Sequence, residues 1–533
     1  MEITDKHIEQ FLAAAHQTGE RRLTRCSSGN LSWRIGEFAL ISATGSWLPE
    51  LQAGQISICR VATGEITNGI HPSMESGFHL QILQNRSDVN VVLHCQSIYA
   101  TTIACMKKKP DNFNVSIGLP QASAARILTQ SQSVQTTPDG ADEYTLAIDI
   151  GTTTVVAYLL SGKTGALLSQ ASTLNPQGQY GADVISRIQY VLDGGREEMQ
   201  RCILAALDSL TRQAAQRAAI APEKITCTAI VGNTAMHHLL LGIDPRPLVT
   251  PPYMPKERAE RVMGAKPLLP TAGNVRILPN IAGFVGGDTV GCLVASRFDR
   301  REALTLLIDI GTNGEMVLGD RNRAVACSTA AGPAFEGAKI SCGMRGAEGA
   351  VDHVFQKGGQ ISYHVIGDVP PKGLCGSGLL DLIAVLLETG EIDEMGRLEH
   401  GDYRLCENVV LTQKDVREVQ LAKAAIRAGI ELMAKHLDVE IASISTVLLA
   451  GAFGNYLDPA SACRIGMIPP RLVEKIQPIG NAAGEGAKLC SLSKAEFAYA
   501  AKLAEETEFL ELAALPEFQD CYVDCLTFEE DDL

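Results

Sequence analysis

The chain carries the stretch Leu146-Ala-Ile-Asp149-Ile-Gly151-Thr152-Thr153-Thr154-Val-Val, and a similar stretch returns as Leu307-Ile-Asp309-Ile-Gly311-Thr312-Asn313-Gly314-Glu-Met-Val. Each copy is an apolar β run that reaches an Asp, then a Gly-Thr turn, then a second apolar run, which is the pattern of a β-hairpin. The two aspartates lie 160 positions apart (309 − 149). Two matched units separated by one domain length predict two related halves that face each other.

Each turn offers groups suited to binding phosphate. A Gly has no Cβ, so the backbone can approach a ligand closely, and consecutive Thr residues present hydroxyls and N–H groups to phosphate oxygens. An Asp at the strand end can hold Mg²⁺ through water. One such hairpin alone is more often a tight turn with a buried Asp. The matched pair predicts a polyphosphate held between the halves by Asp149, Asp309 and the turn residues Gly151, Thr152, Thr153, Thr154, Gly311, Thr312 and Asn313.

Two further glycine turns follow in the second half. An apolar strand from Val447 runs into Gly451, Ala452 and Gly454, where a backbone of small residues can approach an adenine or ribose ring. Gly376, Ser377 and Gly378 precede the apolar stretch 379–388, and their amides are expected at a helix N-terminus, which favours anions. Each turn alone is more often a close-packing device than a ligand loop.

The composition restricts the class of protein. The chain has 533 residues, 46% of them hydrophobic, and carries 46 Lys and Arg against 61 Asp and Glu, a net charge of −15. These values fit a folded protein and argue against nucleic acid or an anionic membrane as the main partner. No apolar run reaches the roughly 18 residues of a membrane helix, and the acidic N-terminus differs from a signal peptide. Since the 15 cysteines form no C-x-x-C pair, a reduced, cytoplasmic setting is expected.

The order of the chain predicts three parts. Residues 1–115 form a first module, and residues 116–143, rich in Ser, Gln, Thr and Ala, read as a linker. From residue 144 onward strands and helices alternate, as in an α/β fold. This stretch divides into a first half, 144–300, and a second half, 301–533.

These turns, in this order, resemble the acetate/sugar kinase, heat-shock chaperone and actin superfamily. More narrowly, residues 144–533 resemble the ATPase part of the reductive activators of corrinoid proteins. The matching blocks are Asn175-Pro-Gln177, Tyr180-Gly-Ala-Asp183-Val-Ile-Ser-Arg187, Gly232-Asn-Thr-Ala-Met-His237, Gly283-Phe-Val-Gly-Gly-Asp288-Thr289, Ala331-Gly-Pro-Ala-Phe-Glu336-Gly, Cys375-Gly-Ser-Gly378, Ile465-Gly-Met-Ile-Pro469 and Gly480-Asn-Ala-Ala-Gly484.

The resemblance implies two ribonuclease-H-like halves of an actin-like ATPase that uses ATP and Mg²⁺. It also implies an activity: hydrolysis drives the reduction of a corrinoid protein from Co(II) to Co(I). The family's ATP site carries over to Asp149, Gly151, Thr152, Thr153, Asp309, Gly311, Thr312, Asn313, Gly451 and Gly454. The resemblance implies that Asp149 and Asp309 are the catalytic residues, which place Mg²⁺ and orient the attacking water. It also suggests a homodimer.

The N-terminal part departs from that family. Typical activators begin with an iron–sulfur domain, which needs C-x₄-C-x₂-C spacing. Residues 1–140 contain only Cys26, Cys59, Cys95 and Cys105, in no such arrangement. We therefore expect no iron–sulfur cluster here and an external electron donor.

The first module instead resembles a truncated class II aldolase/adducin domain. The matching stretches are Ser28–Arg34, Ile41–Gly45, His71–His79 and Val91–Ser97. The resemblance implies substrate phosphate at Asn30, Thr44 and Gly45, an acid/base at Glu75 and zinc at His94. Gln96 stands where a second zinc-binding His is expected, and a third has no counterpart, so we expect no zinc in this module. His71 and His79 are possible substitute ligands, although a surface position on a helix is the more usual interpretation of His79.

Two alternatives stay open at this point. A small-molecule kinase on the same fold would transfer phosphate to a metabolite instead of being stimulated by a corrinoid protein. A metal-dependent aldolase or lyase would act through the N-terminal module and would contain stoichiometric zinc.

Overall fold

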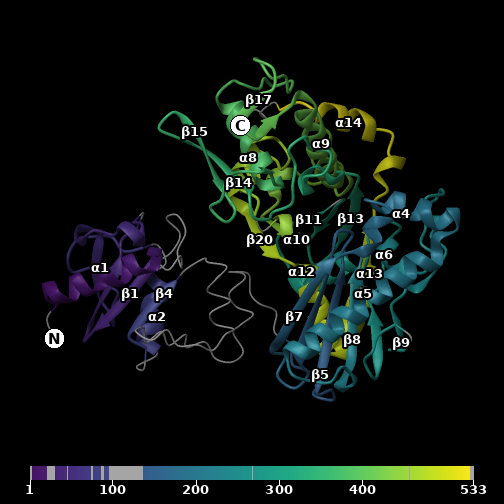
Figure 1. Ribbon diagram of the computed structural model, residues 1–533, viewed down its shortest axis with the longest axis horizontal. Coiled ribbons are helices and arrows are strands. Elements are labelled where there is room, and N and C mark those ends of the chain that lie inside the picture. The colour runs from purple at the N-terminus through teal and green to yellow at the C-terminus, as the bar shows by residue number, and fades with distance from the viewer. Residues whose placement is uncertain are drawn as a thin grey trace. The chain divides into compact units, whose positions relative to one another are not determined.

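The structure is a computed structural model, and it describes residues 3–20, 30–44, 46–73, 76–85, 89–94, 136–266, 268–311, 313–454 and 456–528. The chain divides into two compact units, residues 1–120 and 121–533 (Figure 1). The expected linker lies outside the described residues up to residue 135, and residues 136–143 form no helix or strand.

The first unit is a small α/β module. Its elements are α1 (Asp5–Glu20), β1 (Asn30–Ile35), β2 (Phe38–Ser42), β3 (Ile56–Arg60), α2 (Ser76–Asn85) and β4 (Val91–His94). The strands form an antiparallel sheet in the order β3–β2–β1–β4. Phe11 and Ala15 of α1 are buried in one cluster with Leu31 and Leu40 of the sheet. The amphipathic helix thus covers the apolar face of the sheet.

The second unit begins with a six-stranded sheet. Its strands are β5 (Tyr144–Ile150), β6 (Thr154–Ser161), β7 (Leu167–Leu174), β8 (Ile225–Gly232), β9 (Arg261–Gly264) and β10 (Asn274–Ile277). Its helices are α4 (Val184–Tyr190), α5 (Arg196–Arg217), α6 (Thr234–Leu241) and α7 (Gly287–Ser296). The strand order is β7–β6–β5–β8–β10–β9. Leu146, Ala147 and Ile148 of β5 are fully buried, as expected for a strand covered on both faces.

The second half has its own six-stranded sheet. The strands are β11 (Thr305–Ile310), β12 (Gly314–Gly319), β13 (Ala324–Thr329), β19 (Thr446–Ala450), β20 (Ile476–Gly480) and β21 (Thr507–Phe509), in the order β20–β19–β11–β12–β13–β21. Smaller sheets comprise β14 (Ala350–Lys357), β15 (Gln360–Val365), β16 (Gly373–Leu374), β17 (Tyr403–Cys406) and β18 (Val409–Leu411). The helices are α8 (Gly376–Glu388), α9 (Gln413–His436), α10 (Gly451–Gly454), α11 (Pro459–Arg464), α12 (Ala482–Leu492), α13 (Lys494–Glu506) and α14 (Phe518–Asp524).

Five strands of each large sheet follow the same topology, and the sixth strand lies at opposite edges, β9 beside β10 in the first and β21 beside β13 in the second. In the first half, β5, β6 and β7 pair antiparallel in succession, and β8 and then β10 extend the sheet in parallel on the other side of β5. In the second half, β11, β12 and β13 pair in the same way, and β19 and then β20 extend the sheet beside β11. The duplication predicted from the two Asp hairpins is therefore confirmed at the level of topology.

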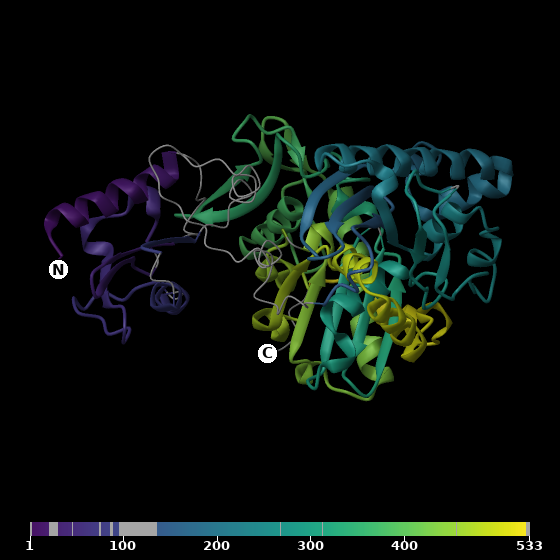
Figure 2. The same cartoon turned by 90° about the horizontal axis from the view of Figure 1, so that it is seen from below.

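Helices α7 and α12 join the two halves. They lie in one buried cluster with residues of both large sheets, for example Ala147 and Val231 of the first and Leu307 and Ala450 of the second. Helix α12, from the second half, packs against β5 and β8 of the first, and Figure 2 shows the yellow C-terminal helices against the blue and teal elements. Gly291 and Gly486 let the two helix backbones meet, since a Cβ at Gly486 would collide with the carbonyl of Gly291.

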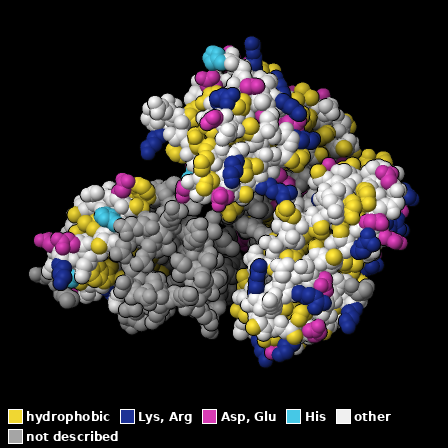
Figure 3. Space-filling view, viewed as in Figure 1, with side chains coloured by type: hydrophobic (Ala, Val, Ile, Leu, Met, Phe, Trp, Pro, Cys, Tyr) yellow, Lys and Arg dark blue, Asp and Glu magenta, His cyan; other side chains and the backbone are white. Residues whose placement is uncertain are grey.

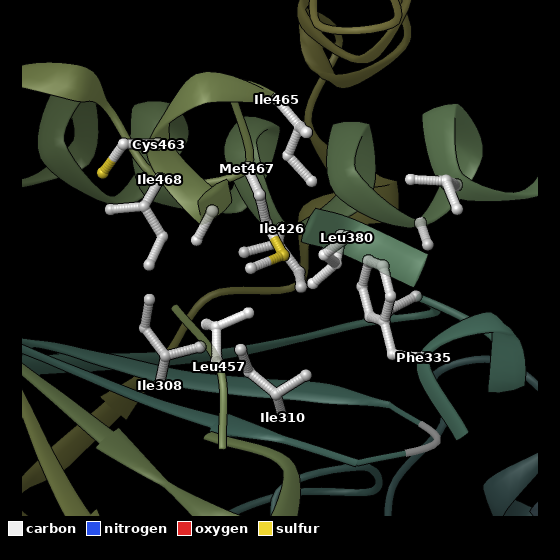
Figure 4. Packing of buried hydrophobic residues seen from close by; sticks show 14 of the residues in the cluster. Ile308, Ile310, Phe335, Leu380, Ile426, Leu457, Cys463, Ile465, Met467 and Ile468 are labelled. Atoms are coloured by element: carbon white, nitrogen blue, oxygen red, sulfur yellow. The ribbon is translucent and has the colours of Figure 1, made fainter. Parts of the chain in front are cut away.

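The second half holds the largest buried cluster. Figure 4 shows Ile308 and Ile310 of β11 facing Leu380 of α8 and Ile426 of α9, with Phe335 beside them. This core fixes the strand that carries Asp309. At the surface, Figure 3 shows acidic and basic side chains interspersed over the face in view. Among the described residues, no helix combines the length and the apolar character needed to span a membrane.

Candidate functional site

Asp149 and Asp309 occupy equivalent places in the two halves. Each is the second-last residue of the first strand of its hairpin, β5 or β11, and each is partly exposed while its strand neighbours are buried. The turns that follow differ by one residue: Gly151 N–H donates to the Thr154 carbonyl over 3.0 Å, and Gly311 N–H donates to the Asn313 carbonyl over 2.9 Å. Both predicted hairpins are present, and their aspartates occupy the same position, next to the end of the first strand.

Two more carboxyl groups complete the site. Asp288 lies in the first turn of α7 and accepts a hydrogen bond from the Thr289 N–H over 2.8 Å. Glu315 stands opposite Asp309 in the β11–β12 pair and is only 7% exposed. The charges of Asp288 and Asp149 act on Asp309, and those of Asp288 and Asp309 act on Glu315. The aspartates from the two halves therefore belong to one acidic cluster, Asp149, Asp288, Asp309 and Glu315.

The acidic cluster holds its protons more tightly than ordinary carboxyls do. Burial raises the pKa of Asp309 to about 7, and the charges of Asp288 and Asp149 add to the rise. Burial also raises the pKa of Asp149 to about 6, against a hydrogen bond from Asn481 that lowers it, and raises the pKa of Asp288 to about 6. The pKa of Glu315 lies well above its usual value, again because of burial first. In the described part of the chain, no Lys or Arg is among the groups that shift these values.

The turn after Asp149 is fixed by residues from three distant segments. The Arg187 guanidinium, only 1% exposed, donates to the Thr152 carbonyl over 2.6 Å. The Asn175 side chain donates to the Gly151 carbonyl over 2.8 Å, and the Asn233 side chain donates to the Thr152 hydroxyl over 3.1 Å. Burial lowers the pKa of Arg187 to about 10. Three blocks of the sequence thus converge on this one turn.

Asn481, the N-cap of α12, links the halves at Asp149. Its side-chain oxygen accepts from the Gly484 N–H over 2.8 Å, and its amide donates to Asp149 Oδ2 over 2.8 Å. The same amide nitrogen lies 3.1 Å from the Tyr158 hydroxyl. One side chain of the second half therefore caps a helix and orients the carboxylate of the first half.

On the second turn, Asp309 is confined by its surroundings. The Cys292 thiol lies 3.7 Å from Asp309 Oδ2. Gly451, with φ +86°, follows β19 directly, and a Cβ there would lie 2.6 Å from Asp309 Oδ1. The side chain of Asn313 forms a hydrogen bond with Glu315. Thr312, between Gly311 and Asn313, lies outside the described residues. Gly451 is therefore the residue that lets the β19 turn approach this carboxylate.

The remaining glycine turns pack closely against their neighbours. Gly376 opens α8 and abuts both the Phe335 carbonyl and the Phe453 ring, and Gly378 abuts the Val351 carbonyl. The Ser377 hydroxyl donates to the Asp352 carbonyl over 2.8 Å. The helix expected at 379–388 is present and begins at residue 376.

On the β19 side, Gly454 lies near Leu449 of β19, and the side chain of Ala452 is not among those described. Gly376, Ser377 and Gly378 contact β14, the turn 333–336 and the Phe453 ring. Since Phe453 lies in the turn after β19, these residues pack against that turn and not against the Asp hairpins in the contacts described.

The structure describes only some of the candidate residues of the N-terminal module. Asn30 is the first residue of β1, is buried, and hydrogen-bonds the imidazole of His79. The other ring nitrogen of His79 lies 2.7 Å from the Ser32 hydroxyl. His79 is fully buried, so its interpretation as a surface histidine is wrong, and with both ring nitrogens engaged it binds no metal in this arrangement. The Thr44 hydroxyl donates to the Pro72 carbonyl over 2.6 Å.

Three candidates of that module are not described. Gly45, Glu75 and the side chain of His94 lie outside the described residues, as does Gln96. Within the described residues, no three side chains of His, Cys, Asp and Glu are arranged to hold a metal ion by themselves.

Sequence reasoning missed Asp288, Glu315, Asn481 and also Glu336, whose carboxylate accepts a hydrogen bond from the Thr153 hydroxyl of the first turn over 2.5 Å. All but Glu315 stand in blocks of the resemblance, which is the signal that singles them out. Glu315 could be identified only from the register of its hairpin, in which it lies opposite Asp309; the equivalent position in the first hairpin, opposite Asp149, is Val156.

Three protein families match parts of the chain. The domain described as "C-terminal domain of RACo the ASKHA domain" matches residues 303–533, and "RACo middle region" matches residues 144–301. "Class II Aldolase and Adducin N-terminal domain" matches residues 9–220. The first two together span both halves of the second unit.

Individual proteins agree with these matches. The corrinoid activation enzyme RamQ of Eubacterium limosum is 37% identical over 413 residues, which are 71% of this chain and 69% of that protein. The solved structure of a reductive activator for a corrinoid, iron–sulfur protein has a TM-score of 0.67 and 35% identity, covering 74% of this chain and 67% of that one. The L-fuculose phosphate aldolase of Methanococcus vannielii is 32% identical over 102 residues, 19% of this chain and 55% of the aldolase. The chain spans about half the length of that aldolase.

Proposed function

Because this chain belongs to the RACo family of corrinoid activators, we propose that it uses ATP hydrolysis to drive the reductive reactivation of a corrinoid protein. In this reaction one electron from a separate donor reduces the cobalt of the partner from Co(II) to Co(I). The observation that carries the proposal is the meeting of Asp149 and Asp309, from equivalent strands of the two halves, in one acidic cluster.

The nucleotide site of this proposal uses both hairpins. The turn of Gly151, Thr152, Thr153 and Thr154 receives phosphate oxygens through N–H and hydroxyl groups, and the shorter turn of Gly311, Thr312 and Asn313 does so from the other half. Arg187, Asn175 and Asn233 hold the first turn through its carbonyls and the Thr152 hydroxyl, so the amides of this turn stay directed at the ligand. Gly451, Ala452 and Gly454 approach the adenosine part, and Gly376, Ser377 and Gly378 support them through Phe453.

The residues present fit a divalent cation. Burial raises the pKa values of Asp149, Asp288 and Asp309, the charge of Asp288 adds to the rise for the other two, and none of the groups acting on them in the described residues is cationic. Because the described carboxyls do not form a metal site by themselves, a cation here would also take oxygens of water and phosphate. Oxygen ligands of this kind suit Mg²⁺, which keeps several waters and takes phosphate oxygens. Asp149 and Asp309 would hold it, and Mg²⁺ would neutralise charge on the phosphates.

Nucleotide binding can change the relation of the two halves. Its proposed ligands come from both sheets, and the halves meet through α7 and α12, whose backbones touch at Gly291 and Gly486. A ligand shifts a conformational equilibrium only by binding one state more tightly. We propose that ATP favours a closed arrangement, which binds the oxidised corrinoid protein.

For the N-terminal module we propose a structural or partner-binding role. Asn30, the phosphate ligand implied by the aldolase resemblance, is engaged by the buried His79, and Gln96 stands at a zinc position. We also propose that the chain carries no iron–sulfur cluster, since residues 1–140 lack the necessary cysteine spacing. It then works with an external electron donor, and as a homodimer. We propose the same domain boundaries as before: the N-terminal module at 1–115, the linker at 116–143, and the two ATPase halves at 144–300 and 301–533.

One experiment tests the function directly. The full-length protein is mixed with a purified corrinoid protein oxidised to Co(II), with Ti(III) citrate as the one-electron donor, and Co(I) is followed by its absorbance. We expect Co(I) to accumulate with Mg²⁺ and ATP, and not with ADP or with Asp309→Asn protein. Equal Co(I) formation without ATP, or transfer of phosphate from ATP to an added metabolite in place of hydrolysis, would contradict the proposal, and the latter would favour the kinase alternative.

A further inference from the structure

Asp149 and Asp309 are each contacted by a side chain of the opposite half. Asn481, the N-cap of α12 in the second half, donates to Asp149 Oδ2 over 2.8 Å. Cys292, in α7 of the first half, donates its thiol hydrogen to Asp309 Oδ2 over 3.7 Å, as a weak donor. Since Asp149 belongs to the first half and Asp309 to the second, the two contacts cross the interface in opposite directions.

The crossing of α7 and α12 places both donors. Gly291 directly precedes Cys292, and a Cβ at Gly291 would lie 2.8 Å from the Ala483 carbonyl of α12. Asn481 lies two residues before Ala483. The two backbones meet at this point because residue 291 has no side chain. A shift of one helix along the other therefore moves both donors relative to the aspartates that they contact.

Each contact leaves the second oxygen of the carboxylate available. In the part of the chain that the structure describes, no hydrogen-bond donor contacts Asp149 Oδ1 or Asp309 Oδ1. Asp309 Oδ1 lies on the side of Gly451, where an added Cβ would be 2.6 Å away. A donor at Oδ2 restricts the rotation of the carboxylate, so Oδ1 keeps one direction. Fixed oxygens of this kind suit Mg²⁺, which requires near-ideal octahedral geometry.

We propose that α7 and α12 form a reciprocal brace, in which Cys292 and Asn481 are positioning residues for the two aspartates of the proposed cation site. The inference rests on the nucleotide site proposed above and deepens it, because each donor acts through the aspartate that it contacts. Since each donor belongs to the opposite half, the free carboxylate oxygens are directed at the cation only in the arrangement of the halves that preserves both contacts. The brace thus links that arrangement to the affinity for the metal–nucleotide complex.

Three substitutions separate the donors from the local structure. Cys292→Ala removes the thiol, and Cys292→Ser supplies a hydroxyl donor in its place. Asn481→Ser keeps an oxygen that can cap α12, but its side chain is one bond shorter and no longer reaches Asp149. Cys227→Ala is the matched control, because Cys227 is a thiol of the same half as Cys292, is 3% exposed and, among the described residues, hydrogen-bonds no carboxylate.

The affinity is measured by calorimetry on the full-length protein, with Mn²⁺ and a non-hydrolysable ATP analogue. For Cys292→Ala we expect the Kd to rise about three- to fivefold, the effect of one weak S–H···O hydrogen bond. For Asn481→Ser, which loses an amide donor to a charged acceptor, we expect a rise of about tenfold or more. Cys292→Ser and Cys227→Ala should bind the complex like wild type.

Two spectra distinguish positioning from a general loss of stability. The infrared difference spectrum between wild type and Cys292→Ala should contain an S–H stretching band at the lowered frequency of a hydrogen-bonded thiol. The EPR spectrum of Mn²⁺ bound with the analogue should differ from that of wild type in Cys292→Ala and Asn481→Ser. It should match wild type in Cys292→Ser and Cys227→Ala.

The outcomes for the brace and for the proposed function can be told apart. An S–H band at the frequency of a free thiol, or wild-type affinity in either Cys292→Ala or Asn481→Ser, would overturn the inference. The proposed function would then stand, because wild-type protein still binds the metal–nucleotide complex. If wild-type protein binds no Mn²⁺ with the analogue, the proposed function fails and the inference fails with it.

Discussion

Replacing Gly451 by Ala tests the approach of the β19 turn to Asp309. Gly451 has φ +86°, and an added Cβ would lie 2.6 Å from Asp309 Oδ1, where ordinary contact begins at 3.4 Å. The carboxylate must therefore move by about 0.8 Å (3.4 − 2.6), in addition to a backbone cost of roughly 1–2 kcal/mol for a side chain at this φ. A displacement of about 1 Å in a positioned site can cost up to 100-fold.

We expect Gly451→Ala to raise the Kd for ATP with Mg²⁺ by at least tenfold, which corresponds to about 1.4 kcal/mol. Gly390→Ala is the matched control, because Gly390 lies in the same half with φ +75° and nothing within 4 Å of an added Cβ. Both variants should lose stability in guanidinium unfolding through the backbone cost, Gly451→Ala somewhat more because of the close contact with Asp309, and only Gly451→Ala should lose affinity in calorimetry. Equal affinities for ATP in the two variants would refute the placement of Asp309 in the nucleotide site.

Three further predictions address the acidic cluster, its link to α12 and the first module. In protein stripped of divalent cations by EDTA, the free energy of unfolding should fall as pH rises from about 4 to about 7. The reason is that the folded state retains protons on carboxyls with a pKa of about 6 (Asp149, Asp288) and about 7 (Asp309), which the unfolded chain has released. In thermal unfolding, this dependence of stability on pH should be weaker in Asp309→Asn, and Mg²⁺ should stabilise the protein more at pH 8 than at pH 5; an unchanged pH dependence in the variant would count against the cluster. Asn481→Asp keeps the acceptor that caps α12 but places a carboxylate against Asp149. In denaturant unfolding of the metal-free variant, the free energy of unfolding should be about 1–3 kcal/mol lower than in wild type. A variant as stable as wild type would argue against the contact between Asn481 and Asp149. Elemental analysis of the full-length protein should find far less than one zinc per chain, because Gln96 replaces a ligand, and stoichiometric zinc would reopen the aldolase alternative.

The overall fold could be predicted from the duplicated hairpin because its pattern is local. An apolar run, an Asp and a Gly-Thr turn determine two adjacent strands, and the repeat of that pattern implies a repeat of the sheet. The order of five strands that the two large sheets share bears this out. The expected helix N-terminus at Gly376 is likewise local and is present.

Other parts of the site depend on contacts that no local pattern reveals. Asn481 meets Asp149 across 332 positions, and Glu336 meets Thr153 across 183. These contacts arise because α12 and the 333–336 turn of the second half pack against elements of the first. His79 was misjudged for a related reason: four residues after Glu75 it reads as a helix-surface position, but α2 turns it into the sheet, where Asn30 and Ser32 engage both ring nitrogens.

The most direct test of the central claim is the position of the divalent cation in a crystal structure of the full-length protein with Mn²⁺ and a non-hydrolysable ATP analogue, located by anomalous scattering. We expect one strong peak between Asp149 and Asp309, with the phosphates contacting the turns 151–154 and 311–313. A peak elsewhere, or an analogue that contacts the turn of only one half, would contradict the account.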